Sequence, residues 1–279
     1  MNPTPTSFPS MILYTLALDL PETLDQRLMA KMLAGSLLRN YFAGTVIVVR
    51  NTPEPVFRLL REGLEEVYAP AELLPVSQVA GAAETKAGTF GRHEIAWQRR
   101  RAAAWKVKAH TLFDAAGHDI VLYADADCVT LRGIEHLVEE GAWDIRYLPA
   151  VAPDRGVAVA HAVSSAVWAV RGGICTEVMR EWERRMADHA GEAAPDHAAW
   201  SSLIVDCRSG VLPWRALPFE PHEIVCPLIQ PLIWPRTREA ALLHCTGLPT
   251  GERINFMFAM YMQKYFSDPR GTLLNLLEM

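Results

Sequence analysis

The sequence lacks the usual signs of a secreted, membrane-spanning or nucleic-acid-binding protein. Its five cysteines are scattered without a CxxC pair, which favours reduced thiols over a zinc site or a disulfide framework. Acidic residues outnumber basic ones by 32 to 27, and this net charge of −5 argues against nucleic acid as a partner. The N-terminus has no signal-peptide pattern, and no apolar run reaches the ~20 residues that span a bilayer. We therefore expect a cytoplasmic protein without a transmembrane segment.

Apolar strands alternate with helical patterns in the first part of the chain. Residues 11–18 form a continuous apolar run that is typical of a buried strand, and residues 44–51 (GTVIVVRN) predict a second buried strand. Between them, Thr23 and Gln26 have capping-box spacing at the start of a helical pattern. Residues 52–67 show a second helix start followed by an amphipathic pattern. This alternation predicts an α/β fold with a mainly parallel sheet and helices on both faces.

A long loop and a basic helix are expected next. Residues 69–91 contain several Pro and Gly residues and no sustained period, so we predict a loop there. Residues 92–115 have a helical pattern that is dense in cations. Helix spacing cannot place all of these cations on one face, so we expect most to be solvated and only one or two to reach a shared ligand.

Two carboxylates, Asp125 and Asp127, follow the apolar strand predicted at residues 120–124. Ligands of open α/β sheets bind at the carboxyl ends of the strands. Where the strand turns, both carboxylates can converge on one cation, and hard oxygen ligands favour Mg²⁺ or Mn²⁺. An Asp-x-Asp motif alone is equally consistent with a turn capped by two solvated aspartates, so its context must decide.

Two enzyme classes place this motif after an apolar strand. In haloacid dehalogenase type phosphatases the first Asp is the nucleophile and the second the general acid. That motif ends the first strand of the core, however, whereas here two strand–helix units precede it, and the downstream acids Asp188, Asp196 and Asp206 are scattered. In nucleotide-sugar transferases the motif holds a divalent ion against the donor diphosphate.

Several ordered blocks between about residues 11 and 250 resemble the retaining glycosyltransferases of family 8, which include glycogenin and bacterial lipooligosaccharide galactosyltransferases. The blocks are VLYADADCVTLRGIEHL, AWKVKAHTLFDAAGHD, HAVSSAVWAVRGG, PDHAAWSSLIVD and ALLHCTGLPTGE. The resemblance implies one GT-A domain over residues 1–279, a Rossmann-like fold with a mixed, mainly parallel sheet flanked by helices. Within it, 11–130 would bind the nucleotide sugar, 131–253 the acceptor, and 254–279 would form a C-terminal helical tail.

The resemblance also implies a metal site. Asp125, Asp127 and His244 would bind Mn²⁺ or Mg²⁺, with His244 coming from the late His-x-x-Gly block. Asp125 would also contact the ribose of the donor. Taken by itself, His244 has an alternative interpretation: it is a structural histidine at the end of an apolar strand, with its ring nitrogens hydrogen-bonded to neighbouring residues.

The donor implied by the resemblance is a nucleotide diphosphate sugar, most simply a UDP-sugar. Lys108 and the backbone amides near Gly247 would contact its phosphates. Thr15, Leu16 and Ala17, on the first strand, would line the nucleotide base.

The sequence departs from the family at the sugar site. Relatives carry Asp-Gln-Asp where this chain has Asp196, His197 and Ala198, so only Asp196 matches as the catalytic-site acid. Ser164 stands where Asn is usual, and the Lys-Pro-Trp segment of relatives is absent, which leaves Arg253 as the candidate substitute. No residue is identified as a nucleophile, so retention would follow same-face attack by the acceptor. The alternative is a non-catalytic nucleotide-sugar-binding protein on the same fold.

The acceptor is open to glycans, proteins, lipids and small molecules. Trp214 and Trp234 lie in irregular, Pro-rich chain and are acceptor-site candidates, unless that segment is a packed surface loop. Trp97, Trp105, Trp168 and Trp182 follow helical or strand patterns and are expected in the core. Residues 254–266 are apolar in nearly every helical direction, which predicts packing against the body or a partner, or peripheral contact with a membrane.

Overall fold

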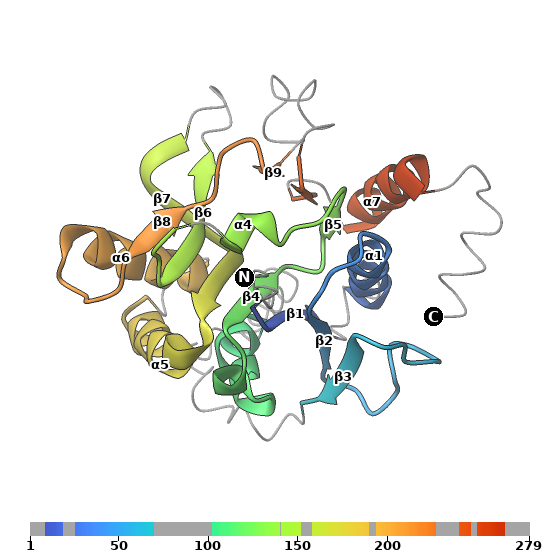
Figure 1. Ribbon diagram of the computed structural model, residues 1–279, viewed down its shortest axis with the longest axis horizontal. Helices are drawn as coiled ribbons and strands as arrows, with labels where there is room; N and C mark the ends of the chain where they lie inside the picture. The colour runs from blue at the N-terminus through green and yellow to red at the C-terminus, as the bar shows by residue number, and fades with distance from the viewer. Residues whose placement is uncertain are drawn as a thin grey trace, which may run out of the picture.

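A seven-stranded mixed sheet forms the centre of the molecule (Figure 1). The structure is a computed structural model that describes residues 9–18, 26–69, 102–139, 141–151, 158–189, 194–226, 240–246 and 250–265. The strand order is β3-β2-β1-β4-β7-β6-β8. The bounds of these strands are β1 (Met11–Ala17), β2 (Thr45–Arg50), β3 (Leu64–Tyr68), β4 (Ile120–Ala124), β6 (Ile145–Val151), β7 (Ala158–Arg171) and β8 (Ala216–Pro218). Neighbours among β3, β2, β1 and β4 are parallel, and β7 is antiparallel to β4 and β6, which confirms the predicted α/β fold.

A smaller sheet and a set of helices complete the described fold. The small sheet has the order β5-β10-β9 and consists of β5 (Cys128–Thr130), β9 (Ile224–Val225) and β10 (Leu242–His244). The helices are α1 (Gln26–Arg39), α4 (His136–Glu139), α5 (Gly172–Asp188), α6 (Pro195–Ser209) and α7 (Thr250–Tyr265). Residues 102–108 are also helical and continue into the short 3₁₀ turns η2 (Ala109–Leu112) and η3 (Ala115–Gly117).

Strands β1 and β4 are buried along their whole length. Leu13 and Leu122 belong to an apolar cluster that includes residues of α1 and α7. Tyr14 and Tyr123 point to the opposite face, into a cluster that includes α5 and α6. In Figure 1 these two pairs of helices lie on opposite sides of the molecule. The continuous apolar runs therefore reflect burial of these strands on both faces.

The prediction of a helix over residues 52–67 is wrong. The chain forms bends and turns there and then the parallel edge strand β3. The Glu66 carboxylate, on β3, accepts hydrogen bonds from the backbone N–H groups of Val56 and Phe57 and so fixes the preceding loop. Gly63 has a φ of +77°, which ends the turn in a conformation that interrupts a right-handed helix. These long-range contacts override the local helical pattern.

Some sequence predictions fall wholly or partly outside the described residues. Only residue 69 of the predicted 69–91 loop is described. The helix predicted over 92–115 is confirmed for 102–108, after which the chain turns into η2 and η3. The predicted N-terminal cap at Thr23 also lies outside the described residues, while the helix that it would begin is present as α1.

Helix α7 packs against the body of the protein. Its side chains Met257 and Tyr261 are buried in the cluster that includes α1. The Arg39 guanidinium, at the end of α1, donates a hydrogen bond of 3.2 Å to the Tyr261 hydroxyl. Residues 250–265 thus pack against the body, as one of the sequence alternatives predicted. Across the described ranges, no helix is long and apolar enough to cross a membrane.

Arg185 joins α5 to α6, and its loss is expected to destabilise the fold. Its buried guanidinium lies 2.7 Å from Asp206, 2.8 Å from the Ser202 hydroxyl and 2.7 Å from Glu181. Arg185→Ala should lower the free energy of unfolding by about 2 kcal/mol, because partly buried acceptors lose a charged donor. The neighbouring Arg184→Ala removes an exposed ion pair with Glu181 and should destabilise the fold much less, because solvent screens exposed pairs. Urea unfolding of both variants checks this, and equal losses would contradict it.

Candidate functional site

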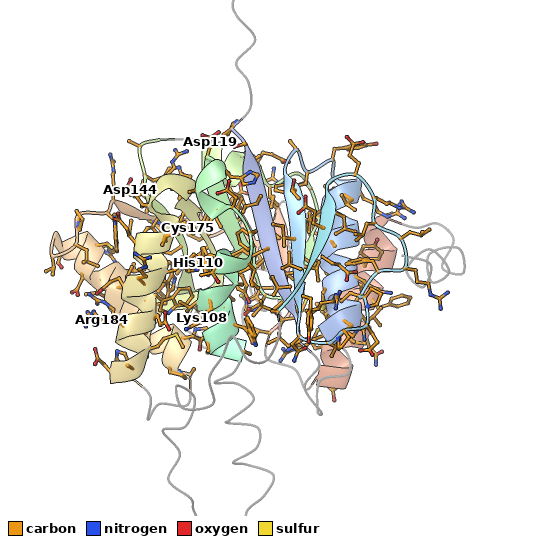
Figure 2. The ribbon with its side chains drawn as sticks, turned by 90° about the horizontal axis from the view of Figure 1, so that it is seen from below. Lys108, His110, Asp119, Asp144, Cys175 and Arg184 are labelled. Atoms are coloured by element: carbon orange, nitrogen blue, oxygen red, sulfur yellow. The ribbon has the colours of Figure 1, made fainter. Side chains whose placement is uncertain are left out.

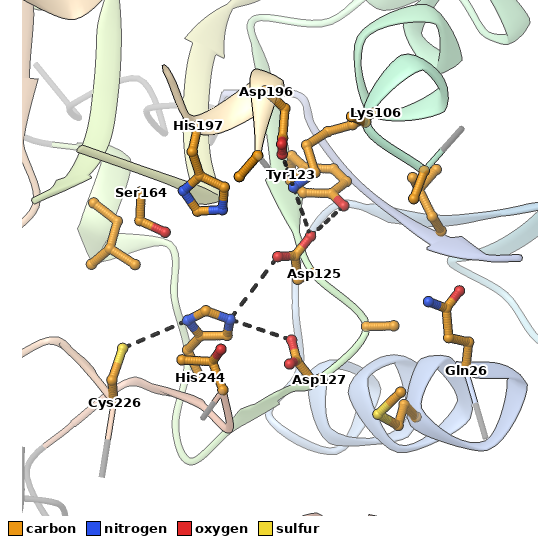
Figure 3. A pocket seen from close by; sticks show the side chains of 18 of the residues that line it. Gln26, Lys106, Tyr123, Asp125, Asp127, Ser164, Asp196, His197, Cys226 and His244 are labelled. Atoms are coloured by element: carbon orange, nitrogen blue, oxygen red, sulfur yellow. Dashed lines mark hydrogen bonds and ion pairs between the residues drawn. The ribbon is translucent and has the colours of Figure 1, made fainter. Parts of the chain in front are cut away.

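A pocket of about 540 Å³ opens at the carboxyl ends of β1 and β4 (Figure 3). The chain runs from β1 outward to β2 and β3, and then returns to place β4 on the other side of β1. Such a reversal leaves a crevice where open α/β sheets bind ligands. Charged residues reach the pocket from several elements: Lys106, Asp125, Asp127, Asp196, His197, His244 and Arg253.

Lys106, Asp125 and Asp196 form a buried charge network. The Lys106 ammonium lies 3.1 Å from a carboxylate oxygen of each aspartate. Burial lowers the pKa of Lys106, but the two carboxylates outweigh burial and hold it above its ordinary value. Burial likewise raises the pKa of Asp196, yet Lys106, His197 and the Ser165 hydroxyl bring it down to about 2. Lys106 therefore remains a cation and Asp196 an anion at neutral pH.

Core aromatic side chains hold this network in place. The Tyr14 hydroxyl donates 2.7 Å to the Lys106 carbonyl, and the Tyr123 hydroxyl donates 2.6 Å to Asp125 Oδ1. The Trp182 indole donates 3.1 Å to the Asp196 carbonyl. These rings pack with Trp168 and Trp200 at centroid separations of 4.5 to 5.8 Å. The prediction of a core position is confirmed for Trp105, Trp168 and Trp182, whereas Trp97 lies outside the described residues.

Asp127, His244 and Arg253 form a second charged group beside the first. His244 Nε2 lies 3.3 Å from Asp127 Oδ1 and 4.0 Å from Asp125 Oδ2, and Arg253 Nη1 lies 2.8 Å from Asp127 Oδ2. Burial lowers the pKa of His244, but Asp127 raises it above its ordinary value. Burial raises the pKa of Asp127, whereas His244 and Arg253 lower it. Both aspartates of the motif thus converge on one imidazole nitrogen.

Asp127 Oδ1 retains unused acceptor capacity. This buried oxygen is close enough to His244 for an ion pair, yet among the described residues it makes no hydrogen bond of good geometry. A buried carboxylate oxygen in this state is well suited to receive a cation.

Backbone pairing explains why the two aspartates meet. The Asp125 N–H donates to the Ala166 carbonyl of β7, so this residue stays attached to the large sheet. The Asp127 carbonyl accepts from the Cys245 N–H, next to β10 of the small sheet. A turn with a 3.1 Å hydrogen bond from the Cys128 N–H to the Asp125 carbonyl links the two sheets. The motif therefore bridges the sheets, and both carboxylates face the pocket.

His197 is held as a neutral hydrogen-bond donor. Its Nδ1 lies 3.4 Å from the Ser165 backbone N–H, which can only donate, so Nδ1 accepts and the ring proton resides on Nε2. Burial lowers the pKa of His197, which favours this neutral form. A neutral imidazole with its proton on Nε2 can donate a hydrogen bond to a ligand in the pocket, but it cannot act there as a base.

The residues predicted to bind the donor differ in whether they line the pocket. Leu16 lines the pocket, whereas Thr15 and Ala17 are buried in the strand and do not appear among its lining residues. Gly247 lies outside the described residues. Lys108 does not line the pocket, because its ammonium lies 3.0 Å from Glu183 on α5 (Figure 2).

Lys106 occupies the place expected of Lys108. The two lysines share a helix and are two residues apart, so their side chains diverge by about 200°. Sequence periodicity did not identify which lysine faces the sheet. The acceptor candidate Trp214 also lies outside the pocket lining and packs partly buried against the core cluster of α5 and α6, while Trp234 is not described.

The structure resembles known glycosyltransferases. Neither a protein-family model nor a curated protein sequence matches the chain. The galactosyltransferase LgtC, solved with donor and acceptor sugar analogues, has a TM-score of 0.54 at 14% identity, over 92% of this chain and 98% of that one. Mouse xyloside xylosyltransferase 1, in its apo form, has a TM-score of 0.52 at 12% identity, over 86% and 100%. At these identities the likeness shows the fold, which is a GT-A glycosyltransferase fold.

Proposed function

We propose that the protein is a metal-dependent glycosyltransferase that moves a sugar from a nucleotide diphosphate sugar, a UDP-sugar, to an acceptor. The observation that carries this proposal is the convergence of Asp125, Asp127 and His244 beside Lys106, in the switch-point pocket of a GT-A fold. The acceptor would be a glycan, a protein, a lipid or a small molecule, and no nucleic acid is expected.

The residues of the pocket fit a divalent cation such as Mn²⁺ or Mg²⁺. Each of the two carboxylates has an oxygen within 4.0 Å of His244 Nε2, and Asp127 Oδ1 has acceptor capacity to spare. Oxygen-rich donor sets of this kind suit hard divalent ions. A cation bound by Asp125, Asp127 and His244 would offset the negative charge of the donor diphosphate, which grows as the glycosidic bond breaks.

The chain's own residues would bind the donor along the pocket. Leu16 would contact the base, and Lys106 takes the place of Lys108 as the proposed cation near the phosphates. Asp196, one residue before His197, would accept hydrogen bonds from sugar hydroxyls, since its carboxylate stays ionised. The His197 Nε2–H would donate to a sugar oxygen.

Retention would follow attack on the face that the leaving group occupies. The acceptor oxygen forms its bond to the anomeric carbon as the bond to the diphosphate oxygen breaks. The acceptor hydroxyl proton passes to the departing diphosphate. Lys106 and its neighbours would stabilise this charge more in the transition state than in the ground state.

Calorimetry with UDP and GDP tests the proposal. UDP should bind in the presence of Mn²⁺ and lose that affinity after chelation, and a UDP-sugar should be hydrolysed slowly without an acceptor. Failure of both nucleotides to bind under all conditions would overturn the proposal. UDP binding without any hydrolysis or transfer, across a panel of UDP-sugars, would instead favour a non-catalytic nucleotide-sugar-binding protein.

His197 should contribute to substrate affinity through a donated hydrogen bond. His197→Ala is expected to raise KM for the donor sugar by about tenfold, the value of a hydrogen bond of roughly 1.4 kcal/mol. His197→Gln offers a side-chain N–H and should recover part of this loss. Steady-state kinetics of both variants, compared with His189→Ala at the end of α5, make the measurement. A pH dependence of kcat that the wild type shows and His197→Ala loses would contradict the donor role.

A further inference from the structure

The metal-binding side of the pocket also contains thiols. One ligand atom each from Asp127, Cys128 and His244 lies within 4.8 Å of the other two, and all three side chains are buried. Cys226, which is not part of this group, has its sulfur 3.6 Å from His244 Nδ1 (Figure 3). Hard ions such as Mn²⁺ and Mg²⁺ make little use of sulfur, so the proposed function does not explain these cysteines.

We propose that Asp127, Cys128 and His244 bind a thiophilic divalent ion, Zn²⁺ or a similar metal. This site shares Asp127 and His244 with the proposed hard-metal site, but the Cys128 thiolate replaces the Asp125 carboxylate. Binding of the ion stands independently of the proposed function, whereas its effect on sugar transfer rests on it. Zn²⁺ would exclude Mn²⁺ and so inhibit transfer.

The distances suit a small tetrahedral ion. Bond lengths of about 2.0–2.3 Å to N, O and S ligands place neighbouring ligand atoms of a tetrahedral zinc site roughly 3.3–3.8 Å apart. His244 Nε2 and Asp127 Oδ1 are already 3.3 Å apart. The Cys128 sulfur lies within 4.8 Å of a ligand atom of each of the other two residues, so it would have to approach them by no more than about 1.5 Å.

The backbone presents these three ligands as one unit. Cys128 and His244 are directly opposed in the antiparallel pair of β5 and β10, and the Cys245 N–H donates 2.8 Å to the Asp127 carbonyl. Asp127 and His244 line the pocket, whereas Cys128 lies beneath them. Three protein ligands with one position open to the pocket are typical of accessible zinc sites.

Cys226 would orient the imidazole. With a proton on Nδ1 directed at the Cys226 sulfur, the Nε2 lone pair is free to bind the ion. Formation of the S–metal bond releases the Cys128 thiol proton to solvent, and formation of the N–metal bond releases the proton held on His244 Nε2, so the binding step needs no oxidant.

Cobalt substitution tests the site without nucleotide or activity. Co²⁺ should bind the purified protein with a thiolate-to-cobalt charge-transfer band in the near ultraviolet, and Zn²⁺ should displace it. In Cys128→Ser the band should vanish and Zn²⁺ affinity should fall by at least about tenfold, while Mn²⁺ affinity stays within about twofold. Cys207→Ser, on α6 and outside this group, is the matched control and should retain the band.

The wild-type spectrum alone can overturn the proposal. Absence of Co²⁺ binding, or Co²⁺ bound without a thiolate band, excludes Cys128 as a ligand even if Cys128→Ser does not fold. UDP binding with no thiolate band would overturn this inference and leave the proposed function intact. A thiolate band without any nucleotide binding would support this inference and overturn the proposed function.

Discussion

Asp127→Asn is expected to lower UDP-sugar turnover by about 10²-fold or more and to abolish the Mn²⁺-dependent part of UDP binding. The substitution keeps the size of the side chain but removes the charge that faces both His244 and Arg253. A proposed metal ligand and a counter-charge to two cations are lost together, and losing one transition-state contact of this kind costs about 10²–10³ in rate. Calorimetry with UDP and measurement of donor hydrolysis would quantify both effects.

A control at the opposite end of β4 separates chemistry from folding. Asp119 lies at the amino end of β4, where its carboxylate accepts hydrogen bonds from the Ser10 backbone and hydroxyl (Figure 2). Asp119→Asn should leave UDP binding and turnover within about twofold, because it changes one exposed contact far from the pocket. If Asp127→Asn keeps full metal-dependent UDP binding, the assignment of Asp127 to the metal site is wrong.

Lys106→Met should reduce turnover by about 10²-fold, whereas Lys108→Met should change it less than about twofold. Lys106 is buried between Asp125 and Asp196, while Lys108 pairs with the half-exposed Glu183 on α5. Methionine keeps the apolar stem of lysine and removes the charge, so the comparison isolates the cation. Steady-state kinetics on the two variants tests which lysine serves the donor.

The same substitution should destabilise the protein in a pH-dependent way. Burial raises the pKa of Asp196, but Lys106, His197 and Ser165 hold it at about 2, below the value of about 3.9 in an unfolded chain. Ionised Asp196 therefore contributes stability that is fully present above about pH 4 and is lost as the pH falls towards 2. Asp125 also faces Lys106, so the variant leaves two carboxylates without their shared cation.

Lys106→Met should accordingly lower the free energy of unfolding by about 3 kcal/mol at pH 7, the usual cost of breaking a buried pair. Its deficit relative to the wild type should narrow below about pH 4, because the pKa of Asp196 rises once Lys106 is gone. Urea unfolding at pH 7 and pH 3 gives both values. A deficit that is equal at the two pH values would contradict the charge network, and Lys106→Arg should restore part of the stability.

Sequence patterns predicted the central strands of the sheet correctly but did not predict the edge strand β3. The apolar runs of β1, β2 and β4 have enough local signal to identify buried strands, since each needs burial on both faces. At β3 the local pattern favoured a helix, and contacts from Glu66 to residues ten and nine positions earlier decided otherwise. This edge strand has two adjacent glutamates in its centre, so it carries little of the alternation that marks a strand.

Part of the candidate site could likewise be predicted from the sequence, and part could not. Asp125, Asp127 and His244 could be singled out because each lies in a short motif next to an apolar strand, and the structure brings all three together. Their roles as ligands, and that of Asp196 in catalysis, remain predictions. Thr15 and Ala17 were expected at the base-binding wall, yet strand alternation and burial leave Leu16 as the described member of that set that lines the pocket.

By itself, the sequence determined the α/β frame, the position of the acidic motif at a strand end and the resemblance to a sugar transferase, because these depend on neighbouring residues along the chain. Only the tertiary structure decided that Lys106 rather than Lys108 faces the pocket, that Ser165 sets the tautomer of His197, and that Cys128 lies beside Asp127 and His244. Each of these depends on helix rotation or on pairing between strands distant in sequence. Such contacts arise from packing, which no local pattern encodes.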